Sequence, residues 1–468
     1  MADPRGRRSR PGGRPPRRRA PDDPPRRAAY DVLRAVRVDD AYTNLVLPGA
    51  LRAHGLSGRD AAFATELASG TLRRRGTYDA VLTACLDRPL AKVEAKALDV
   101  LRLGAHQLLS MRVPVHAAIS TSVDLARDRA GQGAAGFVNA VLRRVAERDL
   151  GAWVRQVAPD PATDPVGFAA VAHSHPRWVV ERLREALGDR AEEVDDLLAA
   201  DTDAPAVVLV ARLGRSTRAE LPGEPTRWSP FGAVSGGGDP AGLPAVAEGR
   251  AGVQDEGSQL VALALARAEL ADSSGADERW LDLCAGPGGK AALLAGLAGQ
   301  AGAVLTAVER QPHRAGLVRR ALTGSPGVGG VVVADGRRPP FEAGSFDRVL
   351  VDAPCTGLGA LRRRPESRWR RRPEDLDVLV PLQRDLLDAA LDLVRPGGVV
   401  VYATCSPVLA ETRDIVGRVL LRRDDVLLED ARPLLGVPDA DGPLAGTVQL
   451  WPHRHRTDAM FVALLRRA

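Results

Sequence analysis

The chain has 468 residues, of which 45% are hydrophobic, enough for two to four domains with buried cores. No stretch approaches the ~18 apolar residues that cross a bilayer, and the Arg/Pro-rich N-terminus lacks the apolar segment of a secretory signal. These features exclude a membrane-spanning or secreted protein, so we expect a cytoplasmic one. The four cysteines show no CxxC spacing, which argues against a metal site.

The net charge of +6 is unevenly distributed along the chain. Residues 1–27 contain ten Arg and three Asp, a net charge of +7, so residues 28–468 carry a net charge of −1. The composition of residues 1–27, rich in Arg, Pro and Gly, predicts a disordered tail. Such a tail serves either as a sequence-independent arm for nucleic acid or only as an aid to solubility, and the sequence does not decide between them.

Residues 28–150 show helical spacing of apolar residues and no clear strand, so we predict an all-helical domain there. Residues 151–252 contain one amphipathic helix, Pro176–Leu187, and one β-branched run, Ala206–Val210, followed by Gly/Pro-rich sequence. This pattern predicts a small connecting α/β subdomain and linker.

From residue 253 to residue 468, short apolar runs alternate with helical stretches. Alternation of this kind predicts a Rossmann-like α/β domain, a parallel sheet with helices on both faces. The expected strands are Trp280–Leu283, Ala303–Val308, Gly330–Ala334, Arg348–Val351 and Gly398–Ala403, and the expected helices are Lys290–Leu297, His313–Leu322, Leu376–Val394 and Leu409–Leu420. Ligands of such sheets bind at the carboxyl ends of the strands, which is where the functional residues are to be sought.

The first of these strands runs into a glycine-rich loop. Glycines allow a sharp turn and a close approach of the backbone to a ligand, although many such turns carry glycine only for packing. The loop does not follow the GxGxxG pattern of dinucleotide-binding folds. Its residues are Cys284, Ala285, Gly286, Pro287, Gly288, Gly289 and Lys290.

Three acidic residues, Glu309, Asp335 and Asp352, follow the next three predicted strands. Any one of them alone is more simply explained as a helix N-cap or an exposed turn residue. Together with the glycine loop at the same edge they favour a ligand site, because acids at these positions can bind ribose hydroxyls and an adenine amino group. The pattern fits an adenosyl cofactor without phosphates.

Two cysteines, Cys355 and Cys405, lie in polar turns at the predicted carboxyl edge, whereas Cys85 lies in an apolar helical stretch where a buried structural role suffices. A thiolate at such an edge is suited to the methylation of cytosine at C5. C5 of cytosine is a poor nucleophile by itself, and addition of a thiolate to C6 makes C5 able to accept a methyl group. The base must first be single-stranded or leave its stack.

The motifs Leu281-Asp-Leu-Cys-Ala-Gly-Pro-Gly-Gly-Lys290, Asp352-Ala-Pro-Cys355 and Ala403-Thr-Cys405-Ser resemble those of RNA cytosine-C5 methyltransferases. In the N-terminal part, Ser57-Gly-Arg-Asp60, Tyr78-Asp-Ala80, Leu101-Arg-Leu-Gly104 and residues 137–144 resemble the NusB-like helical domain. The combination is similar to the RsmB (Sun/Fmu) family, which modifies 16S ribosomal RNA. One departure is that Asp458 is followed by Ala459, where the family usually has glycine.

The resemblance implies a role for each matching residue. Cys405 would be the nucleophile, and Cys355 would assist release of the product. The loop Cys284–Lys290 with Glu309, Asp335 and Asp352 would hold S-adenosylmethionine. The implied substrate is 16S ribosomal RNA, with no metal involved, and we expect a monomer.

The RNA-facing surface is predicted from charge. Seven of the eleven residues 362–372 are Arg, and Trp369 lies among them, which favours contact with phosphates and a base over a solvated charged loop. Residues 73–75 and 143–144 of the helical domain form a second candidate surface. Two alternatives stay open: the same chemistry on tRNA, or a non-catalytic RNA-binding factor of ribosome assembly. The two thiols argue against the latter.

Overall fold

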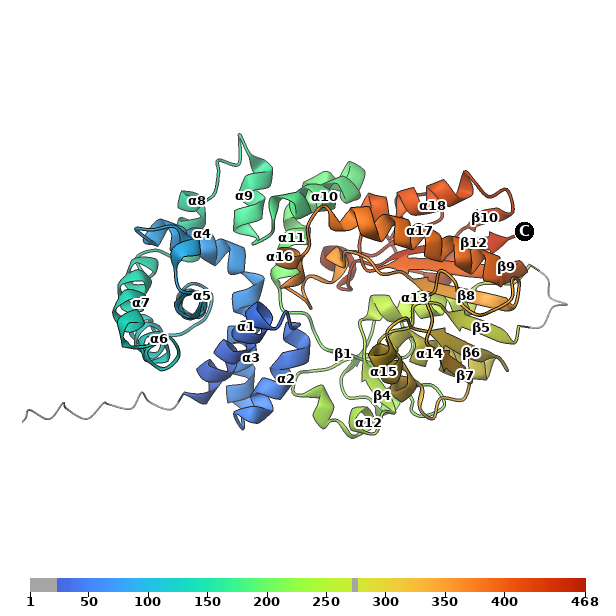
Figure 1. The fold of residues 1–468 in the computed structure, drawn as a ribbon, viewed down its shortest axis with the longest axis horizontal. Helices are drawn as coiled ribbons and strands as arrows, with labels where there is room; N and C mark the ends of the chain where they lie inside the picture. Colours follow the sequence, from blue (N-terminus) through green and yellow to red (C-terminus); the bar gives the residue numbers. More distant parts are fainter. Residues whose placement is uncertain (1–22, 272–276) are drawn as a thin grey trace, which may run out of the picture.

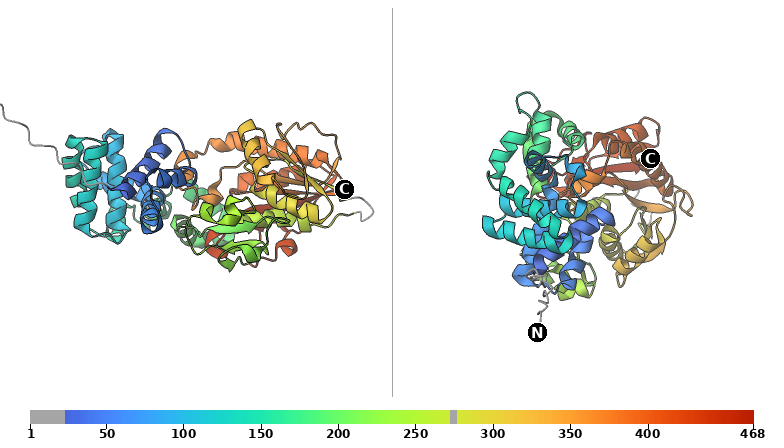
Figure 2. Two further views of the ribbon diagram at one scale, coloured as in Figure 1. Left: turned by 90° about the horizontal axis from the view of Figure 1, so that it is seen from below. Right: turned by 60° about the vertical axis from the view of Figure 1, so that its left-hand side comes forward.

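The computed structural model describes residues 23–271 and 277–468. The molecule is elongated, with a helical domain at one end and a sheet-containing domain at the other (Figures 1 and 2). Most of the predicted tail, residues 1–22, lies outside the described residues. The chain is helical from Pro24 onward because the Asp23 carboxylate accepts a hydrogen bond from the Arg26 backbone N–H and caps the first helix.

The helical domain confirms the all-helical prediction. Its elements are α1 (Pro24–Val38), α2 (Thr43–Ala53), α3 (Gly58–Arg73), α4 (Arg75–Cys85), η1 (Leu90–Lys92), α5 (Ala95–Leu109), α6 (Val115–Arg129), α7 (Gln132–Val145) and α8 (Leu150–Val157). Their apolar faces enclose one core that includes Tyr78, Leu101 and the buried Cys85. Helix α8 begins at Leu150, the residue at which we predict the helical domain to end. Its Trp153 nevertheless packs into the core of that domain and donates a hydrogen bond to the Val145 carbonyl.

A connecting segment follows, and it spans the distance between the two larger domains (Figure 1). It contains α9 (Pro165–Ala172), α10 (Arg177–Leu187), η2 (Gly188–Glu193), α11 (Val194–Thr202), β1 (Val208–Ala211), η3 (Arg218–Glu220), β2 (Glu224–Pro225), β3 (Gly232–Val234), η4 (Pro240–Gly242), α12 (Pro244–Ala247) and β4 (Ala251–Val253). The four short strands form an antiparallel sheet in the order β2-β3-β1-β4. The predicted helix and strand are present within a residue or two of their expected bounds.

The C-terminal domain is a Rossmann-like fold. Its elements are α13 (Glu256–Arg267), β5 (Arg279–Asp282), α14 (Gly289–Gln300), β6 (Val304–Val308), α15 (Pro312–Leu322), β7 (Val328–Val332), β8 (Phe346–Asp352), η5 (Leu358–Ala360), α16 (Ser367–Arg370), α17 (Asp375–Leu393), β9 (Val394–Thr404), η6 (Leu409–Glu411), α18 (Arg413–Leu420), β10 (Val426–Glu429), α19 (Arg432–Leu435), β11 (Val448–Gln449), α20 (Pro452–His455) and β12 (Phe461–Arg467). The main strand order is β10-β12-β9-β8-β5-β6-β7.

The sheet is mixed rather than wholly parallel. Strands β9, β8, β5, β6 and β7 are parallel, as predicted, but β12 runs antiparallel between β9 and β10. The reason lies in the connection that precedes β12. Residues 430–460 contain only short elements and no long crossover helix, so β12 starts at the edge where β10 ends and runs back.

Helices cover both faces of this sheet and explain its continuous apolar strands. In β9, Val399 and Val401 belong to the core shared with α13 and α14, whereas Val400 and Tyr402 belong to the core shared with α17 and α18. Strands buried on both faces need apolar residues at successive positions. Among the described residues, no helix combines the length and apolar composition needed to cross a bilayer.

The predicted RNA-binding segment, residues 362–372, is largely a structural element that joins the domains. The Glu366 carboxylate accepts hydrogen bonds from the backbone N–H and the hydroxyl of Thr43 in the helical domain (3.0 and 2.8 Å). Arg370 donates to the carbonyls of Val36 and Ala41. A Cβ on Gly76 would lie 2.4 Å from the Trp369 ring, so the indole packs directly against the backbone of α4.

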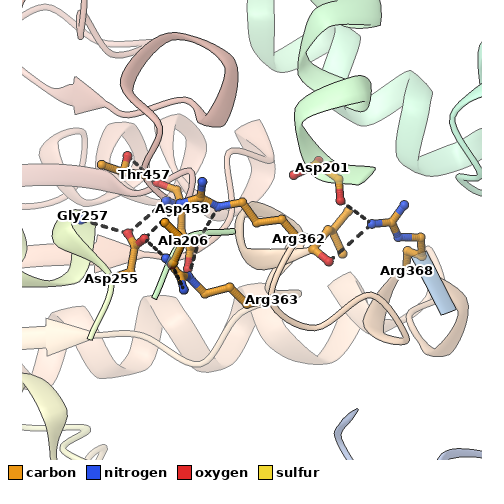
Figure 3. A network of polar contacts seen from close by, with 10 residues as sticks. Asp201, Ala206, Asp255, Gly257, Arg362, Arg363, Arg368, Thr457 and Asp458 are labelled. Carbon is orange, nitrogen blue, oxygen red and sulfur yellow. Dashed lines mark hydrogen bonds and ion pairs between the residues drawn. The ribbon is translucent and has the colours of Figure 1, made fainter. Parts of the chain in front are cut away.

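Arg368 forms the centre of this junction. Its side chain is fully buried, and its guanidinium donates to the carbonyls of Arg73, Ser174, Asp201 and Leu361, which come from three domains. Figure 3 shows the hydrogen bond to Asp201. Burial lowers the pKa of Arg368 to about 10. The prediction of RNA contact is therefore wrong for the arginines of this segment that point inward. A run of charged residues in a sequence does not reveal whether the partners will be protein carbonyls or phosphates.

Residues 73–75, part of the second candidate RNA-binding surface, also make contacts within the protein. Arg73 is buried, and the Arg75 guanidinium lies 5.8 Å from the centre of the Trp369 ring.

Replacing Arg368 by methionine should destabilise the junction. The substitution keeps much of the volume but leaves buried carbonyls without donors, at a cost of roughly 3 kcal/mol. Thermal unfolding should shift to lower temperature, and solution scattering should show a less compact particle. Arg372→Met, at an exposed position of the same segment, is the matched control. Equal unfolding temperatures for the two variants would show that Arg368 does not hold the domains together.

Candidate functional site

Three turns meet at the carboxyl edge of the parallel strands. Strand β5 pairs with β8, and β8 pairs with β9, so Asp352 at the end of β8 lies opposite Ala403 near the end of β9. The glycine loop follows β5, the Cys355 turn follows β8, and the Cys405 turn follows β9. The sheet therefore brings together residues that are more than a hundred positions apart in the sequence.

The thiols of Cys355 and Cys405 are in contact, with 3.5 Å between their sulfur atoms. Cys355 is buried and Cys405 is half-buried. The hydrogen bond with Cys355 is the largest effect on the Cys405 thiol, and it lowers the pKa. Burial and the charge of Asp352 raise this pKa, whereas Lys290 and Arg364 lower it further. The same hydrogen bond, burial and nearby negative charge raise the pKa of Cys355 well above its usual value. The surroundings therefore favour ionisation of Cys405 over ionisation of Cys355.

Lys290, one of only three lysines in the chain, is the cation nearest this edge. Its amine donates to the Asp352 carboxylate (2.8 Å) and to the Ser258 hydroxyl (3.3 Å). Burial by itself lowers the pKa of Lys290, but the charge and hydrogen bond of Asp352, together with the charges of Cys405 and Asp282, outweigh burial and raise the pKa. Lys290 thus stays charged, and it stabilises negative charge on both Asp352 and Cys405.

The glycine loop is shaped by its neighbours. A Cβ on Gly286 would lie 2.0 Å from the Glu309 carboxylate, and Gly288 has a φ of +109° with Val318 and Ala321 close behind it. Only glycine fits these two positions. The loop is therefore pressed against the end of β6 and the start of the helix that follows, which places its backbone beside Glu309.

The predicted acids lie where the sequence placed them, at the ends of β6, β7 and β8. Glu309 is largely buried and accepts a hydrogen bond from the Gln311 backbone N–H (2.8 Å). Asp335 is paired with Arg337, which holds the pKa of its carboxyl at about 2. All three carboxylates therefore border the glycine loop edge, and each already has a cationic partner: Arg314 for Glu309, Arg337 for Asp335 and Lys290 for Asp352.

Two polar residues beside the loop were not singled out from the sequence. The buried Asp282, in β5, has one carboxylate oxygen without a hydrogen-bond partner, and burial raises its pKa to about 7. The side-chain amide of Gln254 is also buried and unpartnered, and it lies 3.8 Å from the Cβ position of Gly289. Unsatisfied buried groups of this kind mark a place for a polar ligand. The site therefore fits a cofactor with hydroxyl and amino groups.

Cys284 belongs to the loop but not to the reactive thiols. Burial, followed by the charges of Asp282, Asp352 and Glu309, raises its pKa well above the usual value. It therefore remains protonated. Across residues 23–271 and 277–468, no group of three or more His, Cys, Asp or Glu side chains is placed to hold a metal ion.

Behind the thiols, a buried ion network fixes the turn that carries Cys355 (Figure 3). Arg362 and Arg363 both donate to one oxygen of Asp255 and to one oxygen of Asp458, at 2.6–3.1 Å. The Asp255 carboxylate also accepts the backbone N–H of Asp458 (2.9 Å). No pattern in the sequence predicts this network, since its acids are distant in the chain from its arginines.

The network reaches the Cys405 backbone through two hydrogen bonds. The Ala459 N–H, next to Asp458, donates to the Gly359 carbonyl, and the Gly359 N–H donates to the Cys405 carbonyl (2.8 and 2.9 Å). The segment around Asp458, where the sequence departs from the resemblance, thus supports the site.

Two known families match the two main domains. Residues 23–147 match the NusB family, and residues 271–466 match the family described as 16S rRNA methyltransferase RsmB/F. Neither match covers the connecting segment between them.

Whole-length relatives agree with these matches. A methyltransferase of Mycobacterium tuberculosis is 54% identical over 98% of this chain and 99% of its own length. The ribosomal RNA small subunit methyltransferase B of Pseudomonas syringae is 33% identical over 89% of this chain and 91% of its own, and that of Xylella fastidiosa is 35% identical over 87% and 92%.

Solved structures share the fold. The crystal structure of PH0851 matches with a TM-score of 0.78 at 23% identity, over 95% of this chain and 99% of that one. A methyltransferase homologue from Pyrococcus horikoshii matches with a TM-score of 0.52 at 21% identity, over 66% of this chain and all of that one. With a NusB-like domain, a Rossmann-like domain and full-length relatives of this kind, the chain belongs to the RsmB/F family of S-adenosylmethionine-dependent RNA methyltransferases.

Proposed function

We propose that this enzyme methylates C5 of a cytidine in 16S ribosomal RNA through a covalent bond between Cys405 and C6 of the base. The observation that carries the proposal is the pair of sulfur atoms 3.5 Å apart at the carboxyl edge of the sheet. A pair in which one thiol ionises more readily than its neighbour suits a reaction that both forms and breaks a bond to sulfur.

The first step is addition of the Cys405 thiolate to C6 of the cytosine. A carbon–sulfur bond forms, and the electrons of the C5–C6 double bond make C5 nucleophilic. Lys290 and the Cys355 thiol stabilise the thiolate before the attack, because both lie close to its negative charge. Asp352, fixed by Lys290, is placed to accept a hydrogen bond from the cytosine amino group or to hold the methionine end of the cofactor.

S-adenosylmethionine supplies the methyl group when it is bound. The residues that would hold it are the loop Cys284–Lys290, Glu309, Asp335 and Asp352. The unpartnered groups of Asp282 and Gln254 add to this set. Burial is the largest cause of the raised pKa of Asp282. A positively charged group placed beside this carboxyl would therefore favour its ionised form.

Release requires that C5 lose its proton and that the bond between C6 and Cys405 break. Once Cys405 is bound to carbon, its sulfur carries no charge, so the main cause of the raised pKa of Cys355 disappears. Cys355 can then give its proton to solvent and take the proton from C5. The electrons of that C–H bond restore the C5–C6 double bond, and Cys405 leaves as a thiolate. One proton is released per turnover, and the resting thiol pair is restored.

The choice of 16S RNA is supported by the relatives named ribosomal RNA small subunit methyltransferase B and by the NusB match. Arg364 and Arg372 are the exposed arginines of the 362–372 segment, and Arg364 lies near Cys405. These two therefore remain candidates for contact with RNA phosphates.

Replacing Cys405 by alanine should abolish methyl transfer, because no other described thiol combines a lowered pKa with a place at this edge. Binding of S-adenosylmethionine, measured by isothermal titration calorimetry, should persist, since Cys405 is not among the residues assigned to the cofactor. Transfer of labelled methyl groups to 16S RNA at the wild-type rate in this variant would refute the covalent mechanism.

Replacing Cys355 by alanine should trap the reaction after the methyl group has been transferred. The proton on C5 then has no base, so a covalent protein–RNA complex should accumulate on denaturing gels. The double variant with Cys405→Ala is the control and should show no complex. Normal turnover by Cys355→Ala without a trapped complex would remove this thiol from the release step.

Loss of the gene should remove one or more 5-methylcytosines from 16S RNA, and bisulfite sequencing of total RNA from a deletion strain measures this. Complementation with the wild-type gene, but not with the Cys405→Ala gene, should restore the modification. Loss from tRNA with unchanged 16S RNA would contradict the proposed target and favour the tRNA alternative.

A further inference from the structure

A single buried carboxylate contacts the turns that carry both reactive thiols. Glu411 is fully buried in η6, the short helix that follows the Cys405 turn. One of its oxygens accepts the Thr356 backbone N–H (2.8 Å), and the other accepts the Thr356 hydroxyl (2.5 Å) and the Ser406 hydroxyl (2.6 Å). Thr356 follows Cys355, and Ser406 follows Cys405. Glu411 thus holds the residue directly after each thiol.

Further hydrogen bonds fix this arrangement. The Gln383 side-chain amide, from α17, donates to Glu411 (3.0 Å) and to the carbonyl of Pro354, the residue before Cys355 (2.8 Å). The Thr356 and Ser406 hydroxyls are 3.0 Å apart. The Tyr402 hydroxyl, from β9, donates to the Glu411 carbonyl (2.7 Å). The position of Glu411 is therefore determined by α17, β9 and both turns.

A carboxylate is suited to this position in a way that an amide is not. Its two oxygens accept four hydrogen bonds here, from a backbone amide, a side-chain amide and two hydroxyls. A glutamine would present an NH₂ group to some of these donors and leave them unpaired. None of the four donors carries a positive charge that would offset the charge of Glu411. Glu411 therefore adds a negative charge on the side of the thiol pair where Cys355 lies.

The surroundings of the two sulfur atoms are therefore unequal. Lys290 and Arg364 are cations that act on Cys405, whereas Glu411 is a negative group that acts on Cys355. Once a thiol pair at hydrogen-bond distance has lost one proton, fixed charges decide which sulfur keeps the other.

We propose that Glu411 is a positioning residue that holds the two cysteine turns together and keeps the shared proton on Cys355, which leaves Cys405 as the attacking thiolate. This inference rests on the proposed function for its catalytic meaning. The claim that the two thiols differ in their readiness to ionise rests on the contacts of Glu411, and it can be tested without RNA.

The test uses alkylation of the full-length protein with iodoacetamide near neutral pH, with each cysteine followed by peptide mass spectrometry. In the wild-type protein, Cys405 should react in preference to Cys355. In Glu411→Gln this preference should fall roughly tenfold, the ratio that corresponds to one pKa unit, because Cys355 ionises more readily without the neighbouring charge. The kcat should fall as well, while the KM for RNA stays unchanged.

Glu366→Gln is the matched control. Glu366 is also buried, and it also accepts a backbone N–H and a threonine hydroxyl, but from Thr43 at the domain junction. This variant should lower the unfolding temperature and keep the wild-type alkylation preference. A Glu411→Gln protein that is folded and keeps the wild-type preference would overturn the proposal, as would an equal loss of preference in both variants.

Ser406→Ala covers the case in which Glu411→Gln does not fold. It removes one hydroxyl contact and leaves the charge in place, so kcat should fall while the alkylation preference is kept. Unchanged kcat in this variant would overturn the positioning role. Because the alkylation ratio needs neither RNA nor a methyl donor, it reports on Glu411 even if the Cys405→Ala enzyme were active and the proposed function failed.

Discussion

The loop that leaves β8 is the constraint on which the rest of the structure depends. It begins with one of the two reactive thiols, Cys355, and ends with α16, where the buried Arg368 joins three domains. Between them, Arg362 and Arg363 are fixed by Asp255 and Asp458. The position of the thiol is therefore tied to the docking of the helical domain. The docked NusB-like domain therefore also stabilises the turn that carries Cys355.

Arginine serves this purpose because its guanidinium can donate several hydrogen bonds at once and stays charged when buried. The chain has three lysines in all, so nearly every structural cation is an arginine. The lysine at the site, Lys290, does something different. It places a compact charge between Asp352 and Cys405, where a flexible amine can serve both. The one lysine at this edge therefore acts at Asp352 and Cys405, whereas most of the buried arginines join segments of the chain.

The thiol pair works because its environment is unequal. Two cysteines in identical surroundings would share a proton evenly, and neither would be a reliable nucleophile. Here Lys290 and Arg364 favour ionisation of Cys405, whereas Glu411 disfavours ionisation of Cys355. In the proposed mechanism this asymmetry lets the cycle reset, because bond formation at Cys405 weakens the interaction that raises the pKa of Cys355.

The sequence by itself determined the helical domain, the five parallel strands and the edge at which Cys405, Cys355, Lys290 and the three acids gather. These follow from local periodicity and from the rule that parallel strands end at one edge. Only the tertiary structure decided the direction of β12, the inward role of Arg362, Arg363, Arg368 and Arg370, and the contacts of Glu411 and Asp458. Each depends on partners that are distant in the chain, and the charge or polarity of a residue does not state which partner it will meet.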